Sequence, residues 1–305
     1  EIVFADLQDL MRLEEDMITI AGRPNVGKST LTNYLVGEKI AIVSNKPQTT
    51  RNRICGIVTR EETQFVFVDT PGYHRSRTKL GDYMVNVARE SIADVDATIL
   101  VVEPVANVGG QEEDLIAKIK ASRSPAILAI NKIDTVEKEE LLAVIAAYSQ
   151  YADFDAIIPI SAKTGDGVEA LLDVCEKFAQ ESPFLFPDDM TTDQPERQVM
   201  AEIIREKLLW TLDKEIPHGT AVEITKFSER DSGIIDIDAT IYCEKASHKG
   251  IIIGKQGAML KRISSMARAD CEKFMGTKVF LTTWVKVKEN WRDSDFLVRN
   301  FGYSE

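Results

Sequence analysis

The residues Gly22-Arg-Pro-Asn-Val-Gly-Lys28-Ser29 follow the apolar run Met17–Ala21 and open a helical pattern over Lys28–Val36. This is the G-x-x-x-x-G-K-S pattern in the strand–loop–helix context of a phosphate-binding loop. Backbone N–H groups of such a loop turn inward on phosphates, and the following helix adds its positive N-terminal end. The residues expected to bind a nucleotide here are Gly22, Arg23, Pro24, Asn25, Val26, Gly27, Lys28, Ser29 and Thr30.

Metal and γ-phosphate ligands are predicted in and after this loop. Lys28 supplies a charge to the β- and γ-phosphates, and the Ser29 hydroxyl ligates Mg²⁺. Asp69 ends an apolar run at the head of Asp69-Thr-Pro-Gly72, where a carboxylate can hold Mg²⁺ through water and the Gly72 N–H can sense a γ-phosphate. We therefore add Asp69, Thr70, Pro71, Gly72 and Tyr73 to the expected nucleotide contacts.

The loop Gln48-Thr-Thr-Arg-Asn52 offers a further metal ligand. Successive residues of an extended loop point in opposite directions, so one of its two threonines faces the metal. Thr50 is favoured, with Thr49 as the competing choice and a solvated turn as the structural alternative. The predicted metal ligands are thus Ser29, Thr50 and Asp69.

Guanine specificity is indicated by Asn131-Lys-Ile-Asp134, which follows the apolar run Ala126–Ile130. The Asp134 carboxylate can accept hydrogen bonds from the N1–H and exocyclic amine of guanine, whereas adenine offers neither in that geometry. An unpaired buried carboxylate is costly, so discrimination should be large. The expected base-binding residues are Asn131, Lys132, Asp134, Ser161, Ala162 and Lys163.

Strand and helix patterns alternate as far as about Ala179, which predicts an α/β domain with a mostly parallel sheet covered by helices on both faces. The runs Ile54–Val58 and Gln64–Val68 are too close for a parallel crossover and should form an antiparallel hairpin. Pro- and Asp-rich residues then interrupt both periods. We predict a GTPase domain over 1–182, a linker over 183–196 and a second, α+β domain over 197–305.

The second domain carries a concentration of positive charge. The chain has a net charge of −12, yet residues 245–288 hold ten Lys or Arg against two acids, a net +8. Such a split predicts a localised surface for a polyanion. Within it, Gly254-Lys-Gln-Gly257 fits the loop of a KH domain, whose glycines let the backbone approach single-stranded RNA. The expected RNA contacts are Lys249, Gly254, Lys255, Gln256, Gly257, Lys261 and Arg262.

Other residue types suggest structural roles. The four scattered cysteines are expected to be buried thiols of a reducing compartment. No apolar run is long enough to cross a bilayer. Trp210 and Trp284 are expected in the core.

Taken with PQTTR, SAK and the loop at Gly254, these motifs resemble Era-type GTPases, in which a bacterial P-loop GTPase domain precedes a type II KH domain. The resemblance covers almost the whole length. It implies a GTP-hydrolysing switch that binds 16S ribosomal RNA and assists assembly and maturation of the small ribosomal subunit. It also implies a cytoplasmic, monomeric factor, associated peripherally with the inner face of the cell membrane, with Mg²⁺ bound alongside GTP or GDP.

Tyr73 stands where Ras-like enzymes place the glutamine that orients the attacking water, so intrinsic turnover should be slow. In related GTPases, an asparagine at the position of Asn25 helps to hold a K⁺ ion in place of an arginine finger. The resemblance therefore implies K⁺ activation through Asn25. The predicted catalytic group is Lys28, Thr50, Asp69, Gly72 and Asn25.

Two other functions fit parts of the sequence. Tyr73 leaves open an RNA-binding chaperone for which GTP is mainly a structural ligand and hydrolysis is incidental. A P-loop ATPase or small-molecule kinase is disfavoured by Asp134 and by the lack of a lid signature.

Overall fold

The chain forms two compact units in the computed structural model, which describes residues 14–73, 76, 78–92 and 95–303. The first 13 residues of the predicted GTPase domain lie outside this description. One unit comprises the chain up to Ala41 together with Thr50–Arg75 and Met84–Asp193. The other comprises Gln194–Glu305 and two segments from the amino-terminal half, Ile42–Thr49 and Ser76–Tyr83.

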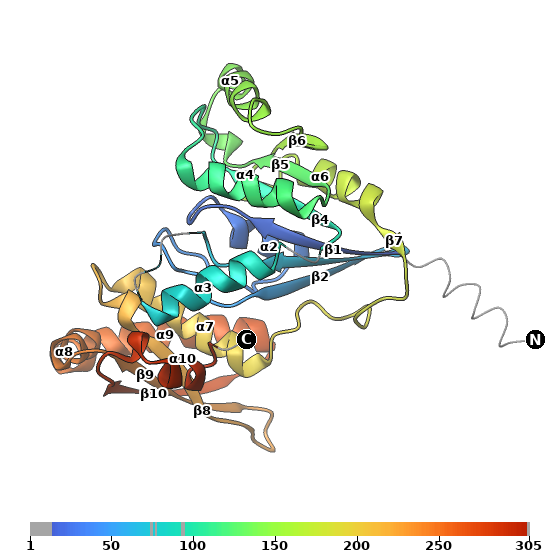
Figure 1. Ribbon diagram of the computed structural model, residues 1–305. Coiled ribbons are helices and arrows are strands. Elements are labelled where there is room, and N and C mark those ends of the chain that lie inside the picture. Colours follow the sequence, from blue (N-terminus) through green and yellow to red (C-terminus); the bar gives the residue numbers. More distant parts are fainter. Residues whose placement is uncertain (1–13, 74–75, 77, 93–94, 304–305) are drawn as a thin grey trace, which may run out of the picture. The chain divides into compact units, whose positions relative to one another are not determined.

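The first unit is built on a mostly parallel sheet. Its strands are β1 (Glu14–Ala21), β2 (Ile54–Arg60), β3 (Thr63–Asp69), β4 (Ala97–Val102), β5 (Ala126–Ile130), β6 (Ala156–Pro159) and β7 (Gln180–Glu181). They follow the order β2-β3-β1-β4-β5-β6 (Figure 1). Neighbouring strands run parallel except for the hairpin of β2 and β3, which turns at Glu61 and Glu62, and for β7, which pairs antiparallel with β1. The mostly parallel sheet and the hairpin are as predicted.

Helices cover both faces of this sheet, because its central strands are apolar on both sides. The helices are α2 (Lys28–Val36), α4 (Gly110–Ser122), α5 (Lys138–Ser149) and α6 (Val168–Cys175). A further helix, α3 (Lys79–Glu90), begins in the segment Ser76–Tyr83 of the second unit and continues into the first. In β4, Ile99 and Val101 pack with side chains of α2 and α6, whereas Leu100 and Val102 pack with those of α4 and α5.

The predicted linker is packed along the first unit for much of its length. Ile57 N–H of β2 donates to the Thr191 carbonyl at 2.9 Å, and Thr192 forms an isolated bridge with Gly56. These contacts cover backbone groups at the open edge of β2, which would otherwise be free to pair with another chain.

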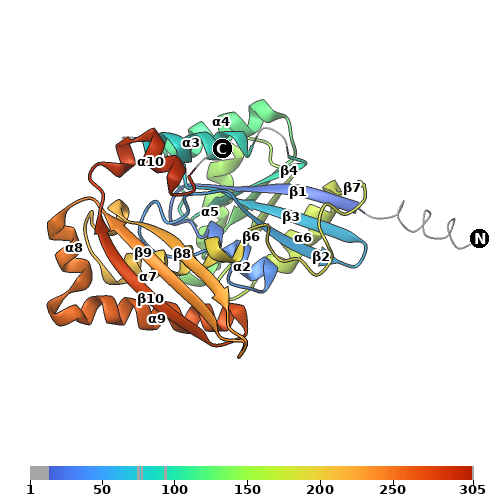
Figure 2. The same cartoon turned by 90° about the horizontal axis from the view of Figure 1, so that it is seen from below.

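The second unit has a three-stranded sheet packed against helices. Its elements are α7 (Glu196–Thr211), β8 (Ala221–Glu229), β9 (Ile235–Cys243), α8 (Ala246–Ile253), α9 (Ala258–Met275), β10 (Val279–Val287) and α10 (Asp295–Asn300). The strand order is β10-β9-β8, with β8 antiparallel and β10 parallel to β9 (Figure 2). Apolar side chains of α7, α8 and α9 pack against these strands in one core. The order helix, strand, strand, helix, loop, helix, strand is that of the predicted type II KH domain.

Most element boundaries differ from the predictions by a few residues. The predicted helix 168–178 is α-helical to Cys175 and continues as a 3₁₀ turn, and α10 was not predicted. Further 3₁₀ turns occupy Ile133–Thr135, Pro217–Gly219, Lys255–Gly257 and Trp291–Asp293.

The expectation for the tryptophans was wrong. Trp210 and Trp284 are 52% and 59% exposed, whereas Trp291 is fully buried. The Trp291 indole N–H donates to the Gly219 carbonyl at 2.9 Å, so its polar atom is satisfied inside the core. Trp284 lies on β10, where successive side chains point alternately into the core and toward solvent. The alternation of residue types in this strand did not show which of its two faces the helices cover.

The four cysteines are buried and free, as expected for structural thiols. None of the helices in the described ranges combines the length and hydropathy that a membrane span needs.

Candidate nucleotide site and RNA-binding loop

The phosphate-binding loop connects β1 to α2 and requires glycine at Gly27. Its φ is 103°, and a Cβ there would lie 2.2 Å from the amide nitrogen of Asn131. That Asn131 amide donates to the Val26 carbonyl at 2.8 Å. The loop is thereby tied to the end of β5, far away in sequence. The backbone of the loop is thus held in shape before any phosphate binds.

Lys28 is buried and donates to carbonyls of its own loop, at 3.2 Å to Gly22 and 3.0 Å to Arg23. Burial lowers the pKa of Lys28 to about 8, and the nearby Asp69 carboxylate opposes that shift. A phosphate would stabilise the charged form of this ammonium. Lys28 therefore lies where a negatively charged ligand is favoured.

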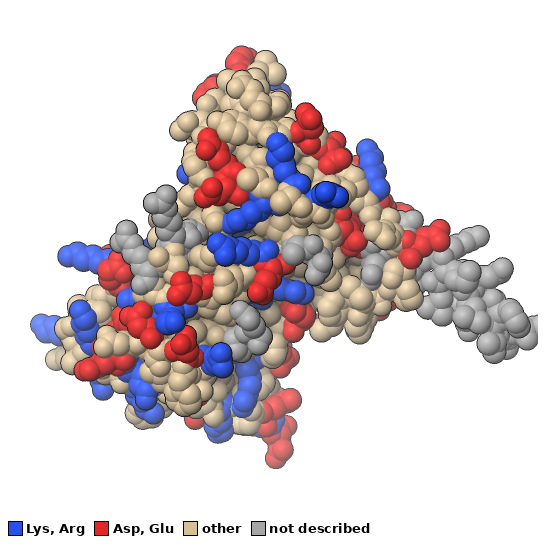
Figure 3. Space-filling model, viewed as in Figure 1, with Lys and Arg blue, Asp and Glu red and all other residues tan. Residues whose placement is uncertain are grey.

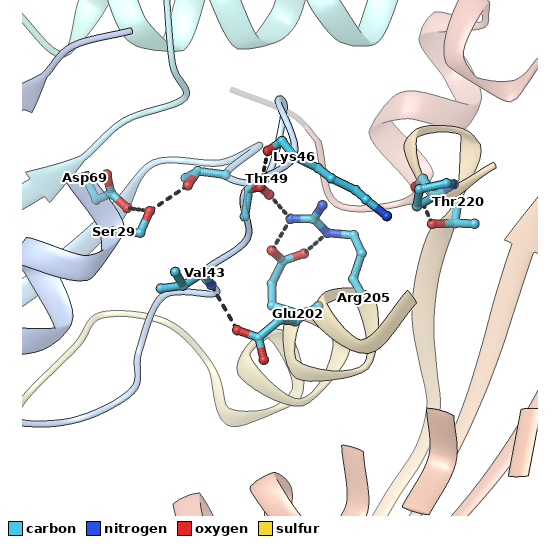
Figure 4. Close-up of polar contacts among 11 residues, drawn as sticks. Ser29, Val43, Lys46, Thr49, Asp69, Glu202, Arg205 and Thr220 are labelled. Atoms are coloured by element: carbon cyan, nitrogen blue, oxygen red, sulfur yellow. Dashed lines mark hydrogen bonds and ion pairs between the residues drawn. The ribbon is translucent and has the colours of Figure 1, made fainter. Parts of the chain in front are cut away.

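Three oxygen-bearing side chains meet at the start of α2 (Figure 4). The Ser29 hydroxyl donates to Asp69 Oδ2 at 2.6 Å and lies 2.9 Å from Thr50 Oγ1. Asp69 Oδ1 is buried and has no hydrogen-bond partner among the described residues. Burial also raises the pKa of Asp69 to about 6, against the opposing charge of Lys28. Hydroxyl and carboxylate oxygens with an unsatisfied acceptor fit Mg²⁺, which prefers oxygen ligands.

The two threonines of the loop after α2 are placed differently. Thr50 is 7% exposed and its hydroxyl faces Ser29, whereas the Thr49 hydroxyl donates to the Lys46 carbonyl at 2.7 Å. This geometry favours Thr50 as the metal ligand.

The predicted base-binding residues come together at the ends of β5 and β6. Asn131 Oδ1 accepts from the Ala162 N–H at 2.9 Å, and the Ser161 hydroxyl donates to Asp134 Oδ1 at 2.8 Å. The Asp134 side chain is exposed, as is that of Lys163. A carboxylate oriented by Ser161 and open to solvent is suited to accept hydrogen bonds from an incoming base.

Sequence reasoning missed an acidic pair beside the loop, Glu103 and Glu112. The Lys132 ammonium donates to Glu103 at 2.5 Å and to the Asn25 carbonyl at 2.7 Å. Arg23 forms ion pairs with both glutamates. These contacts hold the outer side of the loop. Because Glu103 lies just after β4, its position at the carboxyl edge of the sheet was the available signal.

The turn after Asp69 packs tightly on the phosphate-binding loop. A Cβ on Gly72 would lie 2.7 Å from the Pro24 nitrogen, and the Tyr73 N–H donates to the Gly22 carbonyl at 3.3 Å. The Tyr73 ring lies 3.6 Å from the Lys118 ammonium of α4. Thr70 and Pro71 are buried beside this turn, and Thr30 and Val26 lie in the first unit with the other predicted nucleotide residues.

The predicted RNA-binding residues lie in the second unit, apart in the chain from the nucleotide residues. Gly254 ends α8 with φ 72° and ψ 176°, and a Cβ there would lie 2.6 Å from the Met259 Cβ. Gly257 precedes α9 with φ 80° and open space around it. Lys255, Gln256, Lys261 and Arg262 are exposed, and Lys249 is half-buried.

Exposed cations lie in this loop and near the start of the helix after it, at Lys255, Lys261 and Arg262. Figure 3 shows Lys and Arg atoms exposed in the region where Figure 1 places α8, interspersed with acidic ones. The α9 N-terminus directly after Gly257 adds backbone N–H groups with no intrahelical partner, which favour phosphate. This loop has the exposed, cationic character that a nucleic-acid backbone requires.

Comparison with known protein families and proteins shows the family of this chain. Residues 17–132 match the family described as 50S ribosome-binding GTPase, and residues 215–292 match the KH domain. The chain is 52% identical over 293 residues to GTPase Era of Ruminiclostridium cellulolyticum, covering 96% of this chain and 98% of that protein. The chain belongs to the Era GTPase family. GTPase Era of Clostridium kluyveri is 50% identical, with 95% and 99% covered.

Solved Era structures agree with this assignment over both units. A crystal structure of Era in complex with MgGDPNP and nucleotides 1506–1542 of 16S ribosomal RNA matches with a TM-score of 0.92 at 36% identity, covering 96% of this chain and all of that one. An Aquifex aeolicus Era variant bound to GDP·AlF4⁻ matches with the same TM-score, identity and coverage. As an Era-family member, the chain is a GTPase that carries a KH domain.

Proposed function

We propose that this GTPase is a nucleotide-dependent switch that binds 16S ribosomal RNA through its KH domain and assists assembly and maturation of the small ribosomal subunit. The observation that carries the proposal is the joint presence of two candidate sites. The Ser29–Asp69–Thr50 cluster lies with the Asp134–Ser161 pair in one unit, and the Gly254–Gly257 loop lies in the other. The solved relative bound to both ligand types supports this combination.

The roles proposed for the nucleotide site follow from its geometry. Lys28 and the backbone N–H groups of the phosphate-binding loop bind the phosphates, and Asp134 accepts hydrogen bonds from guanine. Ser29, Thr50 and Asp69 would hold Mg²⁺, which would supply positive charge against the charge that develops on the phosphates. Water attacks the γ-phosphate in line, and Gly72 N–H, close to Pro24 of the loop, senses the presence of that phosphate.

Activation by K⁺ is part of the proposal. Tyr73 lies against Lys118 and carries no amide to orient water. Asn25, at the tip of the loop with φ 66°, is the residue proposed to hold the K⁺ ion. The domain limits proposed for these activities are 1–182 for the GTPase, 183–196 for the linker and 197–305 for the KH domain. Cytoplasmic location, peripheral membrane association and a monomeric state stay predictions from the family.

A second candidate function is an RNA chaperone in which GTP is mainly a structural ligand. It is favoured by Tyr73, which cannot orient the attacking water as a glutamine would, so that rapid hydrolysis is not expected. One experiment separates the two. Single-turnover and steady-state GTP hydrolysis would be measured in K⁺ and in Na⁺, with and without a 16S ribosomal RNA 3′ fragment.

A switch should hydrolyse GTP faster with K⁺ and bind the RNA with different affinities in its GTP and GDP forms. A structural role for GTP would leave the RNA affinity the same in both forms. ATP in place of GTP serves as the control for base specificity, and Gly254→Asp with Gly257→Asp as the control for RNA binding.

A further inference from the structure

The chain passes from the second compact unit to the first at the Thr49–Thr50 peptide bond. Residues Ile42–Thr49 belong to the unit built mainly from the KH domain, although the sequence places them inside the GTPase motifs. Thr50, the residue whose hydroxyl faces Ser29, follows directly. The position of the backbone at Thr49 therefore restricts where the Thr50 hydroxyl can lie, because the peptide between them is planar.

Helix α7 and the residue that follows it hold this segment through four contacts, of which three are at Val43 and Lys46. The Val43 N–H donates to Glu206 Oε1 at 2.9 Å, and the Val43 carbonyl accepts from the Trp210 indole N–H at 2.9 Å. The Lys46 ammonium in turn donates to the Leu212 carbonyl just beyond the helix. The two bonds at Val43 use its backbone atoms, so they hold the segment irrespective of the side chain there.

The last contact in the series is made by Arg205 (Figure 4). Its guanidinium is fully buried and forms a bidentate pair with Glu202, with Nε–Oε1 2.8 Å and Nη2–Oε2 2.5 Å. The same Nη2 donates to the carbonyl oxygen of Thr49. A bidentate pair fixes the plane of a guanidinium, so the direction of this third bond is also set.

A buried charge cluster continues from α7 to the helix of the RNA-binding loop. Glu206, fully buried, accepts from Lys207 at 2.8 Å, and Lys207 also pairs with Asp270 of α9. The helix α9 begins directly after Gly257. The side chains that hold residues 43 and 49 are thus attached to the framework that presents the RNA-binding loop.

We propose that Arg205 is a positioning residue for the nucleotide site. By holding the Thr49 carbonyl, Arg205 directs the Thr50 hydroxyl toward Ser29. The KH-containing unit thereby controls how tightly GTP with Mg²⁺ is bound. The inference rests on the proposed function. It gives a role at the nucleotide site to a residue that lies outside the GTPase motifs, in the KH-containing part of the chain. In GTPases, the loop that supplies this metal ligand is ordered by the γ-phosphate and Mg²⁺ and released after hydrolysis. Arg205 should therefore affect GTP binding and leave GDP binding unchanged.

The test measures affinity for a non-hydrolysable GTP analogue and for GDP, each with Mg²⁺, in Arg205→Lys and Arg205→Ala variants of the full chain. Lysine keeps the charge but cannot form a bidentate pair and a third directed bond together. We expect the ratio of GTP-analogue to GDP affinity to fall about tenfold in both variants. Arg197→Ala is the matched control, since Arg197 lies exposed in the first turn of the same helix.

A double-mutant cycle with Thr50→Val shows whether Arg205 acts through Thr50. In the Thr50→Val background, Arg205→Lys should change the affinity ratio less than about twofold, since the hydroxyl that Arg205 positions is already gone. A general structural role would give the same loss in both backgrounds. Thermal unfolding and retained RNA binding identify the variants that are folded. If Arg205→Ala does not fold, the affinity ratio of Arg205→Lys decides the test.

Folded variants with an unchanged affinity ratio, or an effect that is additive with Thr50→Val, would overturn the inference. Failure of the wild-type chain to bind the GTP analogue would instead overturn the proposed function, so the two failures are distinguishable.

Discussion

The two glycine-containing loops of this protein are both shaped for phosphate, but they achieve it in opposite ways. The loop at Gly27 is held from behind by Asn131 and contains the buried Lys28, whereas the loop at Gly254 has exposed Lys255 and Gln256 at its tip. The first fixes its backbone through contacts with distant segments. The second depends on backbone conformation and on cations that remain solvated.

The difference indicates what each ligand requires. A triphosphate with a reacting bond gains most from preorganised donors in a water-poor site. A flexible RNA strand gains most from a close backbone approach and from long-range charge. Mutations should therefore act through specific side chains at the first loop and through backbone geometry and ionic strength at the second.

The largest effect is expected at Gly254. Its φ of 72° with ψ of 176° is open essentially to glycine alone, and a Cβ would collide with Met259. Gly254→Ala should cost about 3 kcal/mol of loop strain and lower RNA affinity about 100-fold. Gly257 is left-handed with open space, so Gly257→Asn should lower RNA affinity no more than about fivefold. Filter binding of the two variants would show whether conformation at these glycines governs RNA binding; equal losses would contradict it.

A stability effect is expected at Asp16 in the first unit, where a polar group is buried without a partner among the described residues. Both its oxygens lack hydrogen bonds there, and burial, with the nearby Asp96 carboxylate, raises the pKa of Asp16 to about 8. Because the pKa is raised on folding, the folded chain retains a proton that the unfolded chain loses. Stability should therefore fall as pH rises from about 4 to about 8.

The variant Asp16→Asn removes this titration. It should raise the free energy of unfolding at pH 7 by about 3 kcal/mol and flatten its dependence on pH. Urea unfolding at pH 5, 6, 7 and 8 would measure both quantities, with the exposed Asp188→Asn as control. A variant with the slope of the wild type would show that this carboxylate does not titrate on folding.

At the base-binding end of the nucleotide site, Asp134→Asn should weaken GTP binding at least tenfold, or by more than about 1.4 kcal/mol, and shift preference toward xanthine nucleotide. Ser161 would still donate a hydrogen bond to the amide oxygen, so the local fold is kept. Calorimetric titration with GTP, XTP and ATP measures the change. Undiminished GTP affinity would refute the guanine assignment.

The smallest effect is expected for Lys255→Ala, since this cation is solvated at the tip of the RNA-binding loop. RNA affinity should fall about threefold, and the slope of log affinity against log salt should become shallower by about 0.7. GTP affinity should be unaffected. A large loss with an unchanged salt slope would mean that Lys255 makes a buried, specific contact instead.

Much of the fold could be predicted from local patterns. The helix Lys28–Val36 and the strand Ala126–Ile130 were predicted with the bounds observed, because apolar periodicity and flanking residues mark both ends. The exposure of Trp284 was predicted wrongly, since β10 is a strand at the end of the sheet and its uncovered face depends on where the helices pack. The helix Asp295–Asn300 is too short to give a periodic signal.

The candidate site shows the same division. Asp69, Asp134 and Ser29 stand in motifs whose spacing carries their chemistry, so the amino-acid order alone was enough to predict their roles. Glu103 and Arg205 stand in no motif. Each contacts a residue that is distant in the sequence. Glu103 accepts from Lys132, 29 positions away, and Arg205 donates to the Thr49 carbonyl, 156 positions away.

By itself, the sequence determined that this chain has a G-x-x-x-x-G-K-S loop, a G-x-x-G loop and a charge split between them, because each depends on a few residues close together along the chain. Only the tertiary structure decided that Ile42–Thr49 packs on α7 and that the Asn131 amide donates to the Val26 carbonyl of the phosphate-binding loop. It also decided that Asp16 is buried with no hydrogen-bond partner in the described part of the chain. Those outcomes depend on which surfaces meet when the core forms, and burial changes the energy of a polar group far more than its sequence neighbours do.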